Sequence, residues 1–200
     1  MNKKILKEKL LYFLGSSVTF GDDGISMVEC IAQRNNYVCV KEAVSGTTLA
    51  DINEQSYVKR LCNLNKSYKI DGFICQLSTN DTRVINKGNV SASFDINSFD
   101  KNTTFGAIEY IIAYVKKTWN CPIYFYTNSF FDNNDYANMV ETLYTISKKW
   151  NIVVIDLFND KKFNDISEKQ RRVFMKDSIH PSKIGYKDWW TPKFEEYLLK

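Results

Sequence analysis

The feature that most constrains this chain is a repeated pattern in which an apolar run stops and small or hydroxyl-bearing residues follow at once. Leu11 to Gly15 is such a run, and Ser16, Ser17 and Thr19 come directly after it. A strand buried on both faces of a parallel sheet has a continuous apolar sequence, and ligands bind beyond the carboxyl ends of such strands. The pattern therefore predicts strands that deliver polar side chains to one edge of a sheet.

Strand-like segments alternate with helix-like segments along the chain. The expected strands are residues 11–15, 37–44, 72–77, 122–127 and 152–157. The expected helices are residues 25–34, 49–64, 105–119 and 135–150, followed by a C-terminal helix interrupted near Pro192. Right-handed crossovers place helices on both faces of a parallel sheet. The alternation predicts an α/β fold, a three-layer α/β/α sandwich with a five-stranded, mostly parallel sheet of flavodoxin-like topology.

Length and composition indicate one domain that spans residues 1–200. A chain of 200 residues, of which 44% are hydrophobic, can bury a core of its own. Residues 83–104 are polar and show no clear periodicity. A connection of this length in a compact domain is usually functional or mobile, so we expect a lid or a pocket wall there.

Charge and hydropathy argue against several classes of partner. The formal charge of +4 is a mild surplus without long Lys or Arg blocks, so we expect no nucleic-acid partner. No apolar stretch approaches the roughly 20 residues of a membrane helix, so we expect no membrane span. Lys7, Glu8 and Lys9 interrupt the N-terminal apolar run, and no small-residue cleavage site follows it. We expect a cytoplasmic location, and the sequence indicates no particular oligomeric state.

Neither the cysteines nor the acidic residues indicate a disulfide framework or a metal site. The five cysteines are odd in number and include no C-x-x-C pair, so we expect reduced core residues. The acidic groups at Asp22 and Asp23 and at 132–135 lack the ligand alternation and the glycine of a calcium loop. We interpret them as solvated helix caps, and we expect no metal and no cofactor.

The single histidine limits the catalytic chemistry open to this chain. A serine hydroxyl needs a base to take its proton, and the base works best when a carboxylate orients it. His180 is the only candidate base of this kind, and Asp177 lies three residues before it in a segment that ends at Pro181. This spacing lets the carboxylate fold back to the near ring nitrogen of His180. The far nitrogen is then free to face Ser17, the candidate nucleophile.

Acyl transfer also needs hydrogen-bond donors aimed at the oxyanion that develops during the reaction. Three candidates lie at the ends of expected strands: the backbone N–H of Ser17, the backbone N–H of Gly46 and the side-chain amide of Asn80. Taken singly, each of these residues has an ordinary structural interpretation as a helix cap, a turn glycine or an Asx turn. Their combination at strand ends, together with an aspartate before the only histidine, favours a hydrolase site.

Four sequence blocks carry a resemblance to a known superfamily. Residues 15–21, Gly46, Asn80 in Ser78-Thr79-Asn80-Asp81, and Asp177-Ser178-Ile179-His180 resemble, in order and spacing, the blocks of the SGNH (GDSL-type) esterase and lipase superfamily. The resemblance spans nearly the whole chain. It implies a three-layer α/β/α fold and a catalytic triad of Ser17, His180 and Asp177. It also implies an oxyanion hole formed by Ser17, Gly46 and Asn80.

Two positions depart from the usual pattern of the superfamily. Ser16 stands where an Asp is typical, and Ser78 stands where a Gly is typical before the Asn-Asp pair. Neither change removes a catalytic atom. The resemblance implies a serine esterase that acts through an acyl-enzyme on Ser17, but it does not choose among carbohydrate O-acetyl groups, lipids, thioesters and small esters. We expect short-chain acyl esters as substrates, with O-acetylated saccharides among them.

Two other functions remain open at this point. A strand that runs into a Ser/Thr/Gly turn is also typical of the phosphate loop of flavodoxin-like FMN carriers, although that function gives Asn80, Asp177 and His180 no role. A catalytically idle carbohydrate- or lipid-binding module on the same fold is the other alternative. Aromatic side chains in expected rim loops could contact a substrate or belong to the core: Phe94, Phe99, Phe130, Phe131 and Tyr136.

Overall fold

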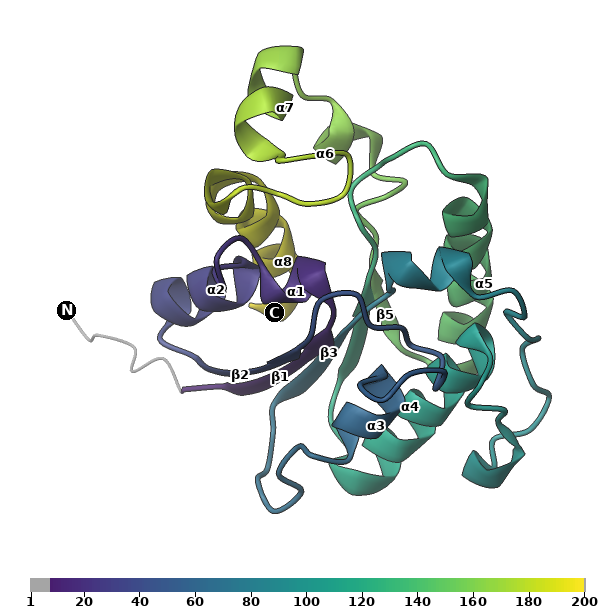
Figure 1. The fold of residues 1–200 in the computed structure, drawn as a ribbon. Coiled ribbons are helices and arrows are strands. Elements are labelled where there is room, and N and C mark those ends of the chain that lie inside the picture. The colour runs from purple at the N-terminus through teal and green to yellow at the C-terminus, as the bar shows by residue number, and fades with distance from the viewer. Residues whose placement is uncertain (1–7, 200) are drawn as a thin grey trace.

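Five parallel strands form the centre of the computed structural model, which describes residues 8–199 (Figure 1). Their spatial order is β2 (Val38–Ala43), β1 (Leu10–Gly15), β3 (Gly72–Gln76), β4 (Ile123–Tyr126) and β5 (Val153–Ile155). Every neighbouring pair is parallel, so all five carboxyl ends lie at one edge. The predicted five-stranded α/β sheet is confirmed, and it is parallel throughout.

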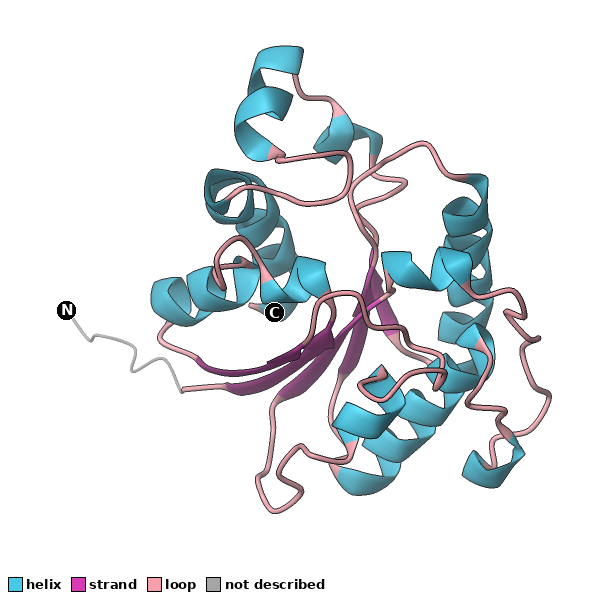
Figure 2. Cartoon of the chain, viewed as in Figure 1, coloured by secondary structure: helices cyan, strands magenta, loops and turns pink. Residues whose placement is uncertain are grey.

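The continuous apolar run of β1 packs against helices on both faces of the sheet. Leu11 and Phe13 belong to one buried cluster, whereas Tyr12 and Leu14 belong to the other. The first cluster lies under three helical elements: α2 (Met27–Asn35), the π-helical η3 (Gly185–Trp190) and α8 (Thr191–Leu198). The second lies under α3 (Tyr57–Leu61), α4 (Thr104–Thr118) and α5 (Asn134–Trp150). Figure 2 shows the resulting three layers, which the β-α alternation predicted.

The remaining helical elements of the described residues are short. They are α1 (Ser17–Phe20), the 3-10 turns η1 (Thr79–Arg83) and η2 (Ile96–Ser98), α6 (Lys161–Asn164) and α7 (Glu168–Phe174). The α6 and α7 helices project beyond the strand ends, at the top of Figure 1. Among the helices of residues 8–199, none combines the length and the apolarity needed to cross a membrane.

The helix expected over residues 49–64 is wrong for its first half. Only α3 forms, after Ser56 caps it by accepting a hydrogen bond from Lys59 N. The backbone N–H groups of Leu49 and Ala50 instead donate to the Asp81 carboxylate, at 2.7 and 3.1 Å. A long-range contact that satisfies these backbone groups competes with a local helix. Sequence periodicity alone could not reveal that competition.

The 83–104 connection is held against the α4 and α5 helices over much of its length. Lys149 on α5 donates to Ser91 O and Ser93 O, at 2.7 and 2.5 Å, and pairs with the buried Glu109 of α4. The Phe94 ring packs on Trp150, with ring centroids 5.0 Å apart. These contacts fix the middle of the connection, so the structure gives that part no features of a lid. Its first residues line cavities, as described below.

Three other expectations have mixed outcomes. Cys75 is buried, but Cys62 is exposed, so the prediction that the cysteines are core residues is wrong at Cys62. The expectation of no export signal falls partly on residues 1–7, which lie outside the described residues. That the chain forms one domain stays a prediction.

Candidate active site

Ser17 is the first residue of α1, directly after the carboxyl end of β1. Gln76, at the end of β3, fixes the turn before Ser17 through hydrogen bonds. Gln76 Oε1 accepts hydrogen bonds from Ser16 N at 2.9 Å and from Thr19 Oγ1 at 2.8 Å. A Cβ on Gly15 would lie 1.6 Å from Thr19 Oγ1, so this close turn requires glycine. Ser17 is thus held at the strand end while Ser16 is buried beneath it.

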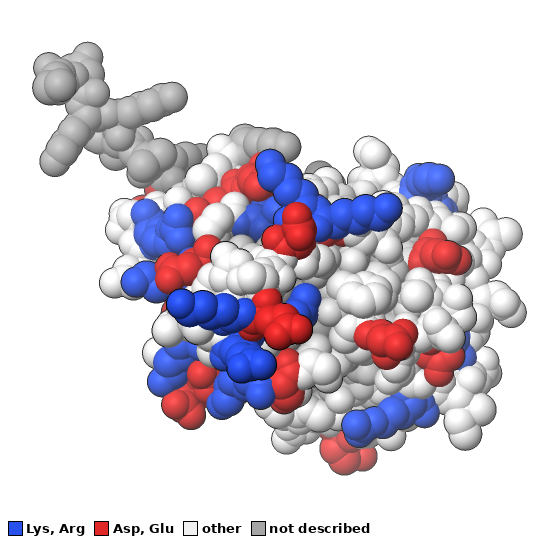
Figure 3. Space-filling model, turned by 90° about the horizontal axis from the view of Figure 1, so that it is seen from above, with Lys and Arg blue, Asp and Glu red and all other residues white. Residues whose placement is uncertain are grey.

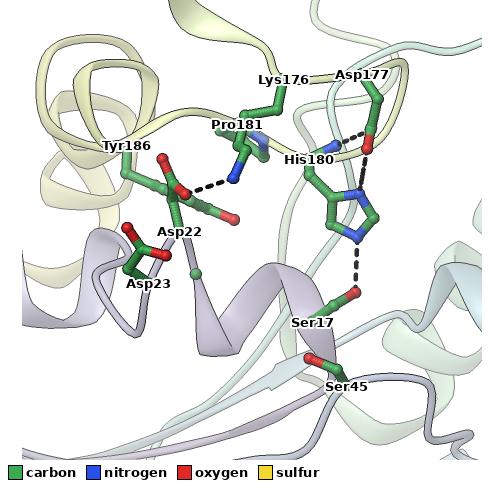
Figure 4. Close-up of a pocket in the computed structure, with 10 residues that line it drawn as sticks. Ser17, Asp22, Asp23, Ser45, Lys176, Asp177, His180, Pro181 and Tyr186 are labelled. Carbon is green, nitrogen blue, oxygen red and sulfur yellow. Dashed lines mark hydrogen bonds and ion pairs between the residues drawn. The ribbon is translucent and has the colours of Figure 1, made fainter.

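The segment that carries His180 is a tight turn built around the Asp177 carboxylate. Asp177 Oδ1 accepts hydrogen bonds from the backbone N–H groups of Ile179 and His180, both at 2.7 Å. Asp177 Oδ2 lies 2.9 Å from His180 Nδ1. On the other side of the ring, His180 Nε2 lies 2.8 Å from Ser17 Oγ (Figure 4). The fold therefore brings Ser17, His180 and Asp177 into one chain of hydrogen bonds.

The electrostatics of this chain favour a charged Asp177. Partial burial of the carboxyl raises its pKa, but the hydrogen bonds from the backbone of His180 and Ile179 and from the His180 ring outweigh burial and hold the pKa below its usual value. A carboxylate only accepts hydrogen bonds, so His180 Nδ1 is the protonated nitrogen in this network. Nε2 is then an acceptor for the Ser17 hydroxyl proton.

Two neighbours hold the Asp177–His180 turn in place. Asn128, which follows β4, donates from Nδ2 to Ile179 O at 3.2 Å. Asp22, which follows α1, pairs with Lys176 at 2.7 Å and accepts a hydrogen bond from Lys183 N at 3.2 Å. The hydrogen bond from Lys176 holds the pKa of Asp22 below its usual value. Sequence reasoning missed Asn128; the one available signal is its place at the carboxyl end of a strand.

The Asn80 side chain reaches the same site from the loop after β3. Its Nδ2 donates to Thr47 O at 3.0 Å, which uses one of the two amide protons. Ser78 Oγ accepts a hydrogen bond from Asn80 N at 3.1 Å and donates to Thr47 O at 3.2 Å. Asn80 lines a cavity of about 410 Å³ together with Ser17 and His180. Its second amide proton is available to a group in that cavity.

Gly46 lies in the turn after β2 and has a left-handed backbone, with φ +79°. A Cβ at this position would meet no atom within 4 Å. Glycine is therefore favoured here by its backbone conformation, and the space beside it is open. Ser45, next to Gly46, lines a cavity of about 200 Å³ with Ser17 and His180.

A buried cation joins the loops that carry the candidate donors. The Arg60 guanidinium donates to Gly15 O at 2.8 Å, to Thr47 Oγ1 at 3.0 Å and to Glu42 O at 2.9 Å. These acceptors lie at the ends of β1 and β2 and in the turn after β2, so a single side chain fixes their spacing. Arg60 was not predicted as a site residue, because a lone arginine in a helical segment carries no such signal.

Asp81 is a buried anion in the same region. Its carboxylate accepts hydrogen bonds from Leu49 N, Ala50 N and Thr104 Oγ1. Burial raises the pKa of Asp81 to about 6, even though these hydrogen bonds favour the charged form. Asp81 thereby fixes the backbone next to Asn80 against the segment that follows Gly46.

The structure places only some of the predicted helix-cap acids and rim-loop aromatic residues beside the candidate site. Asp22 and Asp23 line the cavity of about 200 Å³, and Asp132 lines the cavity of about 410 Å³. Within residues 8–199, no three His, Cys, Asp or Glu side chains gather as metal ligands would. Of the five aromatic residues, Phe131 lines the larger cavity. Tyr136 is fully buried, and its hydroxyl group donates to Leu77 O and accepts from Asn128 N.

Comparison with known proteins gives a likeness at the level of structure. By sequence, no family model and no curated protein matches this chain. A solved structure from Bacteroides ovatus, classed as a GDSL-like lipase, is similar with a TM-score of 0.73 and 18% identity over 96% of this chain and 99% of its own. A member of the lipolytic G-D-S-L family from Veillonella parvula has a TM-score of 0.69 and 17% identity, over 96% and 98%. This chain has the SGNH/GDSL-type fold.

The two departures from the usual sequence pattern of the SGNH/GDSL-type fold have structural counterparts here. Ser16, at the position typical of Asp, lies with its Oγ 3.3 Å from Gln76 Oε1 and is fully buried. Ser78, at the position typical of Gly, caps η1 and joins it to Thr47. Ser78 therefore adds order to the Asn80 loop.

Proposed function

We propose that this protein is a serine ester hydrolase that acts on short-chain acyl esters through an acyl-enzyme on Ser17. The observation that carries the proposal is the hydrogen-bond chain from Ser17 Oγ to His180 Nε2, at 2.8 Å, and from His180 Nδ1 to Asp177 Oδ2, at 2.9 Å. The likeness to GDSL-like lipases supports a hydrolase on this fold. An FMN carrier would give this hydrogen-bond chain no role.

In the first half of the reaction, Ser17 Oγ attacks the ester carbonyl carbon while its proton passes to His180 Nε2. Asp177, which stays charged because its pKa is low, stabilises the imidazolium. The tetrahedral intermediate then collapses: the carbon–oxygen bond to the alcohol breaks, and His180 gives its proton to the departing alkoxide. The product of this half is the acyl-enzyme on Ser17 and a free alcohol.

In the second half, a water molecule takes the place of the alcohol. His180 Nε2 removes a proton from the water, and the resulting hydroxide attacks the acyl carbonyl carbon. The bond to Ser17 Oγ breaks, and His180 returns the proton to Ser17. The acid leaves, and the starting state is restored.

The oxyanion of both tetrahedral intermediates needs donors that are already in place. The free amide proton of Asn80 is one, since Thr47 O holds the other proton and thereby the orientation of the amide. The backbone N–H groups of Ser17 and Gly46 are the other two proposed donors. Arg60 and Asp81 support this arrangement because they fix the loops on which Gly46 and Asn80 lie.

The size of the smaller cavity beside Ser17 supports a short acyl group. It measures about 200 Å³ and is lined partly by charged side chains, including Asp22 and Lys176. A cavity of this volume limits the length of the acyl chain that it can hold. We therefore propose acetyl esters, including O-acetylated saccharides, as substrates.

The test of the proposed function is Ser17→Ala. We expect this change to abolish hydrolysis of p-nitrophenyl acetate and labelling by a fluorophosphonate probe, while the circular dichroism spectrum stays the same. Ser16→Ala is the matched control: it removes a buried hydroxyl group that contacts Gln76, and we expect a loss of no more than about tenfold. Turnover retained by Ser17→Ala would refute the proposal, as would a wild-type protein that the probe does not label.

A further inference from the structure

A second cavity continues the candidate site beyond Ser17. The cavity of about 410 Å³ that contains Ser17, Asn80 and His180 is also lined by Thr82 and Arg83. The same two residues line a neighbouring cavity of about 470 Å³. Residues at the beginning of α5 line both cavities: Asn133 lines the first, and Asp135 and Asn138 line the second. Together they form a groove that runs from Ser17, past Arg83, and along α5.

The second cavity combines a buried apolar floor with an exposed polar rim. Val84, Phe105 and Met139 line it and are 5%, 8% and 1% exposed, so they form its base. Most side chains of the exposed rim can donate or accept hydrogen bonds: Arg83, Asp135 and Asn138, with the half-buried Lys87 and Thr142. The fully exposed Ile85 is the apolar side chain of this rim. A ligand for this cavity needs an apolar face and many polar edge groups.

The charges along the groove argue against a polyion. Arg83 and Lys87 are offset by Asp132 and Asp135 among the lining residues. Figure 3 shows one face of the molecule, on which Lys and Arg interleave with Asp and Glu at the left. On the right of that view, the side on which α5 lies in Figure 1, charged groups of both signs are scattered among uncharged ones. A neutral chain fits this distribution better than a nucleic acid or a polyphosphate does.

Two other extended ligands fit the groove less well. A long acyl chain would place its methylene groups against the polar rim, where little of their burial energy is gained. An extended peptide that binds by adding a strand needs backbone hydrogen bonds at a free sheet edge. This groove is lined by side chains from η1, the residues that follow it, and α5, so it offers no strand for a peptide to pair with.

We propose that this groove binds a neutral oligosaccharide whose O-acetyl group lies at Ser17 and whose further sugar residues extend past Arg83 into the second cavity. This inference rests on the proposed esterase function and names its substrate class. Each sugar ring would lay its C–H face on the apolar floor and direct its hydroxyl groups to the rim. Arg83, which lines both cavities, is the specificity-determining residue because its planar guanidinium can bridge two neighbouring sugars.

The first experiment measures kcat/KM for acetylated xylo-oligosaccharides of one to four residues, with p-nitrophenyl acetate as reference. Binding energy from remote parts of a substrate raises kcat/KM, and we expect an increase of about tenfold or more from the monosaccharide to the tetrasaccharide. An acetylated serine tripeptide and p-nitrophenyl decanoate serve as competing chains. A flat length series, faster turnover of the tripeptide than of the tetrasaccharide, or faster turnover of p-nitrophenyl decanoate than of p-nitrophenyl acetate would overturn the inference. If p-nitrophenyl acetate itself is not hydrolysed, the proposed function fails instead.

The second experiment blocks the far cavity. Thr142→Trp places a large ring in it, and we expect the ratio of kcat/KM for the tetrasaccharide to that for the monosaccharide to fall toward one. Thr145→Trp is the matched control on the same helix, outside the residues that line the cavity, and should keep the wild-type ratio. If Thr142→Trp fails to fold, Asn138→Ala takes its place, with a lowered ratio expected. An unchanged ratio in a folded variant would contradict the proposal.

The third experiment tests Arg83 itself. Arg83→Ala should raise KM for the tetrasaccharide several-fold while kcat changes less, since binding is lost and the reacting groups are untouched. Arg172→Ala removes an arginine of α7 whose side chain is 82% exposed, and it should leave both constants unchanged. Equal losses for the monosaccharide and the tetrasaccharide in Arg83→Ala would show that Arg83 has no role in the recognition of a longer chain.

Discussion

Replacement of Asp177 by Asn offers a sharp test of the proposed mechanism. In the structure, Asp177 Oδ1 accepts two backbone hydrogen bonds and Oδ2 faces His180 Nδ1. An Asn side chain can keep the two backbone hydrogen bonds through its Oδ1. Its amide N–H group then faces His180 Nδ1. That contact favours the tautomer in which Nδ1 accepts and Nε2 carries the proton. Nε2 would then be unable to take the proton of Ser17.

The magnitude follows from the exposure of Asp177. The same tautomer change in a buried triad costs about 10⁴ in kcat. The Asp177 side chain is 55% exposed, so water can partly replace the lost carboxylate. We therefore expect a loss of about 10³, which corresponds to about 4 kcal/mol of transition-state stabilisation. The pKa of Asp177 is lowered in the fold, so its contribution to stability is lost only as the pH falls through that low pKa.

The assay is hydrolysis of p-nitrophenyl acetate near pH 8, where the carboxylate is fully charged. Because His180 is the only histidine, its ring nitrogens can be assigned without ambiguity in a ¹⁵N NMR spectrum. We expect a proton on Nδ1 in the wild type and on Nε2 in Asp177→Asn. Asp188→Asn, an exposed carboxylate in η3, is the control for loss of one charge.

Two outcomes would refute this reasoning. Activity of Asp177→Asn within tenfold of the wild type would show that the carboxylate does not direct the base. A large loss of activity without a change of tautomer would show that the variant acts in another way, such as displacement of the turn. Thermal unfolding of the variant separates the second case from simple loss of the fold.

Three further changes have defined outcomes. Asn80→Ala should lower kcat on p-nitrophenyl acetate by about 10²–10³ with little change in KM, because it removes one oxyanion donor; a change confined to KM would contradict that role. Arg60→Met should lower the free energy of unfolding in urea by about 3 kcal/mol, because it leaves Gly15 O and Thr47 Oγ1 without their buried donor; a shift below 1 kcal/mol would contradict it. Burial raises the pKa of Asp81 to about 6, so its contribution to stability is fully present below about pH 4 and is lost as the pH rises through 6. The stability of the wild type relative to Asp81→Asn should therefore fall by about 3 kcal/mol from pH 4 to pH 8, and a pH-independent difference would refute this.

Much of the fold could be predicted from local patterns. The apolar run of β1 indicates burial on both faces, and the structure places Leu11 and Phe13 in one cluster and Tyr12 and Leu14 in the other. Helix signals worked where caps are local, as at Ser26, whose side chain and Glu29 form a capping box at the start of α2. The helix predicted over residues 49–56 does not form, and the cause is a long-range contact. The backbone N–H groups of Leu49 and Ala50 donate to Asp81, which lies 32 and 31 residues further along the chain.

The candidate site likewise has some features that the sequence predicts and others that depend on long-range contacts. The sequence by itself determined which chemistry the chain can offer: one histidine, an aspartate three residues before it, and polar residues at the ends of strands. Once the strands are parallel, connectivity brings those ends to one edge, so the proximity of Ser17 and Asn80 was predictable. His180 follows no strand, and it was predicted instead as the only histidine, with Asp177 three residues before it. Only the tertiary structure decided what holds them there. Asn128 on the His180 turn and Arg60 between two strand ends act through contacts with residues far away in the chain. Such contacts depend on how whole layers pack, and no local spacing encodes them.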